Sequence, residues 1–132
     1  MALRLKEFLE QILLLLREDF PSQLAKLTRD AEGVTYLQTL DSEEAVIIVR
    51  KNHIEIARRA RKKDINIRVS MSRSCLFKVL EGKQTLSEAL HEGELKVTGD
   101  PMTLLRCYSI WEKVISLART SPRFYFLTYK LR

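Results

Sequence analysis

Apolar side chains, rather than ionisable ones, carry most of the chemistry that this sequence offers. Over residues 102–119 they recur at helical spacing and cover about half of the helical wheel, whereas a helix resting on a sheet usually needs a stripe about 100° wide. The surplus predicts that this helix lines a cavity for an apolar ligand, or that it packs against the N-terminal helix or a second subunit. The apolar set is Leu104, Cys107, Tyr108, Ile110, Trp111, Val114, Ile115, Leu117 and Ala118.

Histidine and cysteine residues form no recognisable catalytic or metal-binding pattern. The sequence has two of each, and it contains no GxSxG, no HExxH, no glycine-rich phosphate loop and no Cys/His cluster with metal spacing. Cys75 and Cys107 lie in apolar helical patterns without CxxC spacing, so we expect two buried, reduced thiols rather than a disulfide or a reactive pair. A dyad of either cysteine with His53 or His91 would lack a supporting third group. We therefore expect no enzyme activity, no cofactor and no metal.

A basic run over residues 58–63 is the clearest charge cluster in a chain of net charge +6. Such a run is typical of a solvated turn, of a contact with an anionic membrane, or of a nucleic-acid or nuclear-import patch. No aromatic residue interleaves with the run, which disfavours nucleic acid because unpaired bases need stacking surfaces. A membrane contact through Arg61, Lys62 and Lys63, at about 1 kcal/mol for each charge, would be transient.

The helices that must position the apolar set can be read from periodicity. A chain of 132 residues predicts one domain, residues 1–132. Residues 3–18 predict a helix with one apolar face, from which Leu14 points away, and Pro21 ends it or begins a shorter helix through 23–27. Two short helices follow Ser72, one ending at Gly82 and the other near Gly93.

Four strands are predicted before Ser72 and one after it. They cover residues 34–40, 45–50, 53–60, 65–71 and 94–98, and the third is ambiguous because its apolar residues also fit a helix. The short connections between the first four favour an antiparallel meander, since parallel crossovers are longer. The predicted fold class is α+β, a five-stranded, mostly antiparallel sheet covered by helices, with an apolar cavity between the layers.

No segment resembles a membrane span or a secretory signal. The longest uninterrupted apolar run is Ile12–Leu16, far short of the roughly 20 residues that a spanning helix needs. Lys6, Glu7 and Glu10 lie too close to that run for a secretory peptide. We expect a soluble, cytoplasmic protein.

The segment 65–113 resembles the sterol carrier protein-2 family. The likeness rests on the strand ending in Met71-Ser72, on Leu80-Glu81-Gly82-Lys83, on Ser87-Glu88-Ala89-Leu90, and above all on the run from Gly93 to Asp100. The resemblance implies an apolar tunnel for a fatty acid, fatty acyl-CoA, sterol or phospholipid, with binding and transfer but no catalysis. The chain differs from the family pattern in its basic turn at 61–64, in the segment after Pro122, and in lacking the terminal peroxisomal tripeptide of some relatives.

On this basis we expect an apolar ligand site with a polar mouth. The predicted lining residues are Ile12, Leu16, Phe77, Leu80, Leu90, Leu104, Tyr108, Trp111 and Val114. Arg17 and Gln23, near the end of the first helix, are the predicted head-group contacts, because a buried carboxylate needs a cationic or hydrogen-bonding partner.

The segment 124–129 is too apolar to hang free in water, so we expect it to dock on the sheet edge, beside the cavity mouth, or on a partner chain. The protein would be a monomer or homodimer. Two other functions stay open: an interaction or dimerisation module of the same fold with a self-filled cavity, and an accessory factor that presents a polyprenyl quinone precursor to membrane enzymes.

Overall fold

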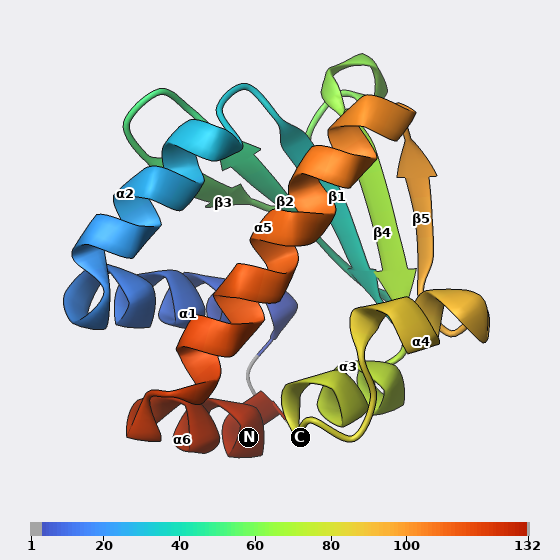
Figure 1. Cartoon of the computed structure of the whole chain (residues 1–132). Helices are drawn as coiled ribbons and strands as arrows, with labels where there is room; N and C mark the ends of the chain where they lie inside the picture. Colours follow the sequence, from blue (N-terminus) through green and yellow to red (C-terminus); the bar gives the residue numbers. More distant parts are fainter. Residues whose placement is uncertain (1–3, 132) are drawn as a thin grey trace.

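The computed structural model describes residues 4–131, which form one mixed sheet with helices on one face and at one end (Figure 1). The strands are β1 (Thr35–Leu40), β2 (Glu43–Val49), β3 (Ile54–Ala57), β4 (Ile67–Met71) and β5 (Lys96–Gly99). The helices are α1 (Leu5–Asp19), α2 (Pro21–Asp30), α3 (Arg73–Leu80), α4 (Leu86–His91), α5 (Pro101–Arg119) and α6 (Pro122–Leu131), and a 3₁₀ turn, η1, covers Lys62–Asp64. The predicted α+β class is confirmed.

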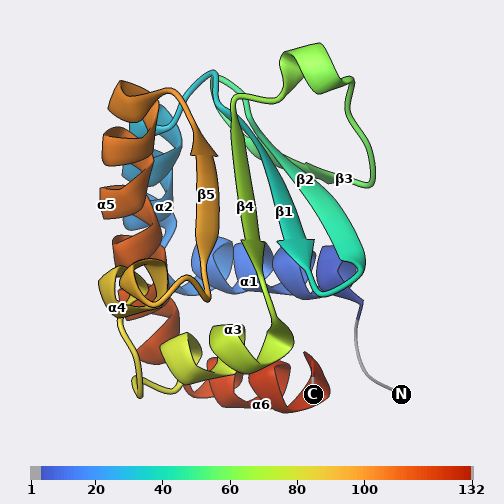
Figure 2. The ribbon, with the colours of Figure 1, turned by 90° about the vertical axis from the view of Figure 1, so that its right-hand side faces the viewer.

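The strand order is β3-β2-β1-β4-β5, and β1 and β4 run parallel. The predicted antiparallel meander of the first four strands is therefore wrong at its last step, because β4 pairs with β1 and not with β3. Residues 58–66 carry the chain past the end of β2 and β1, through η1 (Figure 2). Asn66 fixes the parallel start: its N–H donates to the carbonyl of Thr35 (2.9 Å), and its Oδ1 accepts from the N–H of Thr35 (2.7 Å).

This strand order suits the burial of each strand. Ile67 and Val69 of β4 are buried, so β4 needs a central place, whereas the side chains of β3 are half-buried or exposed and fit an edge. Helices α1, α2 and α5 cover one face of the sheet (Figures 1 and 2). On the uncovered face Arg68, Ser70 and Lys96 are exposed, as expected for a sheet with one solvated side.

Two clusters of buried side chains share the core. The first joins the sheet to α2, α4 and α5, and it includes Tyr36, Ile67, Cys107 and Ile110. The second joins α1 to the ends of the sheet, α3 and α6, and it includes Leu5, Phe8, Leu15, Leu80 and Phe124. Cys75 and Cys107 are buried, free thiols, as predicted.

The segment after Pro122 is a helix and does not lie along the sheet edge. Pro122 stands at its start, where proline costs no hydrogen bond, and α6 packs on α1. Ser121 Oγ donates to Asp19 (2.9 Å), and Arg123 pairs with Glu18 (3.3 Å), so the start of α6 is tied to the end of α1. Phe124 is buried, but helical spacing turns Tyr125 and Phe126 to the surface, so the segment 124–129 is docked through one side only.

Candidate functional site

An apolar cavity lies between the covering helices and the first three strands. Its volume is about 140 Å³. It is lined by Leu9, Ile12, Leu13 and Leu16 of α1; Leu24 and Leu27 of α2, with Ala31; Tyr36 of β1; Ile47 and Val49 of β2; Ile54 and Ile56 of β3; and Ile110, Trp111 and Val114 of α5. No charged side chain contributes to this wall.

Secondary-structure periodicity brings these residues to one place. Leu9, Ile12 and Leu16 follow the i, i+3, i+7 spacing that puts side chains on one helix face. Ile54 and Ile56 alternate along β3, so both point to the helix side of the sheet. Trp111 and Val114 belong to the wide apolar face of α5. The cavity is thus where three amphipathic helices meet the edge of the sheet.

Two aromatic residues, Tyr36 and Trp111, form part of the cavity wall, and the hydroxyl of Tyr36 is hydrogen-bonded. The rings of Tyr36 and Trp111 lie 5.6 Å apart, and the buried hydroxyl of Tyr36 donates to Sγ of Cys107 (3.0 Å). Burial raises the pKa of the Tyr36 phenol and of the Cys107 thiol, so both stay protonated near neutral pH. Such a wall can hold hydrocarbon, but it offers no group for acid–base or nucleophilic chemistry.

The predicted lining residues fall into two sets. Ile12, Leu16, Trp111 and Val114 line the cavity. The others lie elsewhere: Phe77 and Leu80 pack in the second cluster, Leu104 and Tyr108 pack against the first, and Leu90 is 38% exposed at the surface. The cavity therefore lies nearer to α2 and β3 than the sequence indicated.

Sequence reasoning missed the contribution of α2 and β3. The signal for α2 was present, since Leu24, Leu27 and Ala31 follow helical spacing, but this helix was predicted too short. The signal for β3 was not, because its place beside α1 depends on the strand order of the whole sheet.

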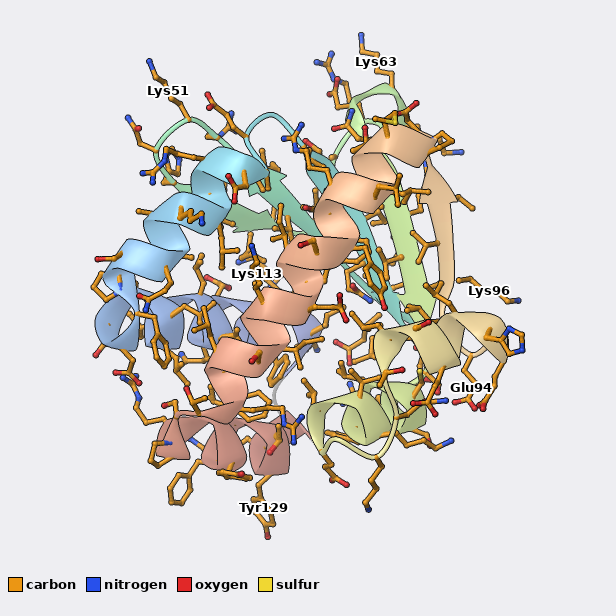
Figure 3. All side chains as sticks on the ribbon, viewed as in Figure 1. Lys51, Lys63, Glu94, Lys96, Lys113 and Tyr129 are labelled. Atoms are coloured by element: carbon orange, nitrogen blue, oxygen red, sulfur yellow. The ribbon has the colours of Figure 1, made fainter. Side chains whose placement is uncertain are left out.

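A shallow groove with cationic walls adjoins the cavity. It lies between α2 and α5, has a volume of about 260 Å³, and is lined by Gln23, Lys26, Leu27, Lys113, Ser116 and Leu117. Leu27 also lines the cavity, so the groove and the cavity share a wall. Figure 3 labels Lys113 beside α5, on the side toward α2. Of the two predicted head-group residues, Gln23 lies in this groove, whereas Arg17 is exposed in the last turn of α1.

The basic turn, residues 61–64, lies at the end of the molecule opposite α6. Arg61, Lys62 and Lys63 are exposed, and Arg61 pairs with Asp64 (3.0 Å). Lys63 projects from that end in Figure 3. Within residues 4–131, no helix is both long enough and apolar enough to cross a bilayer, and no group of three His, Cys, Asp or Glu side chains is placed to hold a metal ion.

Comparison with known proteins agrees with this architecture. Among solved structures, the fold is shared with the UbiJ-SCP2 ubiquinone synthesis protein (18% identity, TM-score 0.61, 80% of this chain and 93% of that one). It is also shared with sterol carrier protein 2 from Yarrowia lipolytica in its apo form (19%, 0.60, 88% and 90%) and with sterol carrier protein domain 2 of Helicoverpa armigera (12%, 0.62, 88% and 95%).

Sequence comparison identifies the family. No curated protein matches this chain by sequence. Residues 11–111, however, match the sequence profile of the SCP-2 sterol transfer family. Six elements line the cavity, and the matched span contains four of them completely: α2, β1, β2 and β3. It also contains α1 from residue 11 onward and the part of α5 that carries Ile110 and Trp111. The chain therefore belongs to the SCP-2 sterol transfer family.

Proposed function

We propose that the protein binds a long-chain lipid in the apolar cavity and transfers it between membranes without catalysis. The observation that carries this proposal is a cavity wall made of aliphatic and aromatic side chains, with no charged residue among them. Ligands with an acyl chain or a sterol skeleton suit such a wall. Family membership supports lipid binding as the general role.

The energetics of hydrocarbon transfer suit a carrier. Moving an acyl chain of about 16 carbons from water to an apolar site is favourable by on the order of 10 kcal/mol, before the costs of binding. A bilayer offers the same carbons nearly the same gain. Exchange between the protein and a membrane is therefore close to balanced, so the protein could both load and unload.

The cavity must widen to accept such a ligand. Its 140 Å³ lies below the roughly 300–1,000 Å³ typical of ligand pockets. We propose α2 as the moving wall for two reasons. Phe20 interrupts the helix between α1 and α2 and could act as a hinge, and α2 is held in the core mainly by its buried residues Leu27 and Thr28. The far end of α2 is held by Arg106, which donates to the carbonyl of Glu32 (2.9 Å), so α2 would swing about that end.

The groove beside α2 would hold a polar head. Gln23, Lys26 and Lys113 could hydrogen-bond and neutralise a carboxylate or phosphate there, while the hydrocarbon passes Leu27 into the cavity. Arg17 stays a predicted contact at the end of α1.

Two alternatives are each favoured by one observation. The small volume of the cavity favours an interaction module in which side chains fill the space. The structural similarity to the UbiJ-SCP2 ubiquinone synthesis protein favours an accessory factor that presents a polyprenyl quinone precursor. A copurifying lipid identified by native mass spectrometry would separate all three: an acyl lipid or sterol, a polyprenyl phenol, or no bound mass.

A paired substitution tests the cavity directly. Val114→Trp places an indole in the cavity, and we expect loss of fatty-acid binding in a folded protein, with overpacking that costs about 1–3 kcal/mol. Val97→Trp is the control, since Val97 is half-buried on β5 and does not line the cavity. Equal fatty-acid affinity in the wild type and both folded variants would contradict the proposal.

A further inference from the structure

Helix α6 presents a face of exposed aromatic rings, which we call the aromatic face: Tyr125, Phe126 and Tyr129. These side chains are 68%, 72% and 80% exposed, whereas Phe124 on the opposite side of the helix is 2% exposed. Burial of the inner side fixes the orientation of the helix, so the aromatic face is held outward rather than turning in. Exposed rings in such a group mark a contact surface.

A polar cleft opens beside the aromatic face and shares Tyr125 with it. The cleft lies between α5, α6 and the connection from α3 to α4, and its volume is about 450 Å³. Its polar walls are Gln84, Thr85, Glu112, Ser116, Arg119 and Thr120. It is separate from the apolar cavity, with which it has no lining residue in common.

Arg119 brings a guanidinium group to this cleft. It has no hydrogen bond or ion pair with any of residues 4–131. The group lies over the backbone of Gly82, where a Cβ atom would come within 2.5 Å of its Nη2. A guanidinium in this position matches the oxygens of a phosphate, to which it can donate two parallel hydrogen bonds.

Gln84 adds an acceptor that nothing in the fold satisfies. The side chain is 8% exposed and its Nε2 donates to Glu92 (3.0 Å), but its Oε1 has no partner among the described residues. A buried amide oxygen left without a donor is costly. Glu112 is a second acceptor on the same cleft wall. The cleft therefore suits a ligand that combines a phosphate for Arg119 with hydroxyl groups for these acceptors.

We propose that the aromatic face and the polar cleft together dock the protein on a bilayer that contains anionic, hydroxyl-bearing phospholipids such as phosphatidylglycerol. Tyrosine and phenylalanine suit the water–lipid boundary, since their rings are apolar and the tyrosine hydroxyl stays hydrated. Lys130 of α6 and Arg119 supply positive charge for such a surface, whereas Arg123 is paired with Glu18. The inference rests on the proposed function, because a carrier must contact membranes.

If α6 docks on a bilayer, the basic turn cannot contact the same bilayer. Figures 1 and 2 place α6 and the basic turn η1 at opposite ends of the molecule, and Figure 3 shows Tyr129 and Lys63 projecting from those two ends. A flat bilayer contacts one end at a time. Docking through α6 therefore leaves Arg61, Lys62 and Lys63 in water, and the two surfaces can be separated by mutation.

The test is cosedimentation of the purified protein with vesicles of phosphatidylcholine alone or mixed with phosphatidylglycerol. Replacing Tyr125, Phe126 and Tyr129 with serine should weaken binding to mixed vesicles by at least about tenfold. Arg119→Gln should weaken it by about fivefold, and on mixed vesicles only. The matched control replaces Arg61, Lys62 and Lys63 with serine and should bind as the wild type does.

Several outcomes would overturn the inference. Loss of binding in the basic-turn variant, with none in the aromatic variant, would place the membrane contact at η1. A wild-type mass of two chains that returns to one on replacing the three rings would make the aromatic face a dimer interface. No vesicle binding by the wild type would also reject it. Fatty-acid titration of each variant keeps the proposed function separate, since all should retain cavity binding, and thermal melts confirm folding.

Discussion

Tyr36 shows how a single buried group links the cavity wall to pH. Burial, and the hydrogen bond to Cys107, raise the pKa of its phenol well above the ordinary value of 10.0. The unfolded chain releases this proton near pH 10 while the folded chain keeps it, so the unfolded state binds fewer protons above that pH. The free energy of unfolding should then fall by about 1.4 kcal/mol per pH unit through this residue.

Comparison of the wild type with Tyr36→Phe isolates that effect. Because phenylalanine has no proton to lose, the variant should lose stability less steeply than the wild type between about pH 9.5 and 11. Urea unfolding at several pH values measures both slopes, and the titration of the other tyrosines and of Cys75 cancels in the difference. Cys107 does not cancel, because the hydrogen bond from Tyr36 lowers its pKa, so both proteins also carry Cys107→Ala. Parallel pH profiles would show that the Tyr36 phenol ionises as readily in the folded protein as in the unfolded one.

Gly82 and Gly93 allow a matched comparison, because they share a backbone conformation but differ in their surroundings. Both have φ of +77°, which costs an L-residue roughly 1–2 kcal/mol, but a Cβ at Gly82 meets the end of Arg119 while one at Gly93 meets nothing within 4 Å. Since the end of an arginine side chain moves easily, Gly82→Ala and Gly93→Ala should lose similar stability, about 1 kcal/mol. Only Gly82→Ala should also weaken binding to phosphatidylglycerol vesicles, by about fivefold. Equal vesicle binding by the two variants would argue against a role for Arg119.

At the scale of elements, the packing of α6 on α1 can be tested with two phenylalanines of α6, Phe124 and Phe126. Phe124 is buried against α1, so Phe124→Ala should cost about 3–5 kcal/mol of unfolding free energy. Phe126 is exposed, and Phe126→Ala should change stability by less than about 0.5 kcal/mol. Chemical denaturation of both variants measures the contrast. Similar small losses in both would mean that α6 does not hold α1 in solution.

The wall formed by α2 makes a second prediction about an element. If α2 swings to admit a ligand, its backbone amides should exchange faster than those of α5 in the lipid-free protein, because α2 is the shorter helix and a short helix opens at lower cost. Bound fatty acid should change exchange in residues 21–30 most. Hydrogen–deuterium exchange with mass spectrometry reads both segments at once. Ligand-induced protection confined to α3 and α4 would place the site elsewhere.

Helices with strong periodicity could be predicted from the sequence, but the pairing of the strands in the sheet could not. The apolar stripes of α1 and α5 gave helix boundaries within a few residues, and they placed Ile12, Trp111 and Val114 at the cavity. The parallel pairing of β1 with β4 could not be predicted, since alternation along a strand does not specify which strand lies beside it. The cavity depends on that pairing, and this is why Phe77 and Leu90 were assigned to a wall they do not reach.

At the scale of the whole molecule, the proposed lipid site and the proposed membrane contact lie in different parts of the fold. The apolar cavity and its cationic groove lie between α1, α2 and α5, whereas the aromatic face and the polar cleft lie at the α6 end. Helix α1 connects them, because it lines the cavity with Leu9, Ile12 and Leu16 and contacts α6. A carrier built this way could sense a membrane at one end while its cargo stays beside the same helix.

The second core cluster, which unites α1 with α6, also sets a constraint on how the chain is made. Helix α1 leaves the ribosome before Phe124, which is buried in the same cluster and follows roughly a hundred residues later. At ordinary rates of synthesis, the apolar face of α1 waits for its cover for on the order of 5–20 s. The second cluster therefore cannot close until α6 has been synthesised, and the nascent chain is a natural client for chaperones that shield apolar helices.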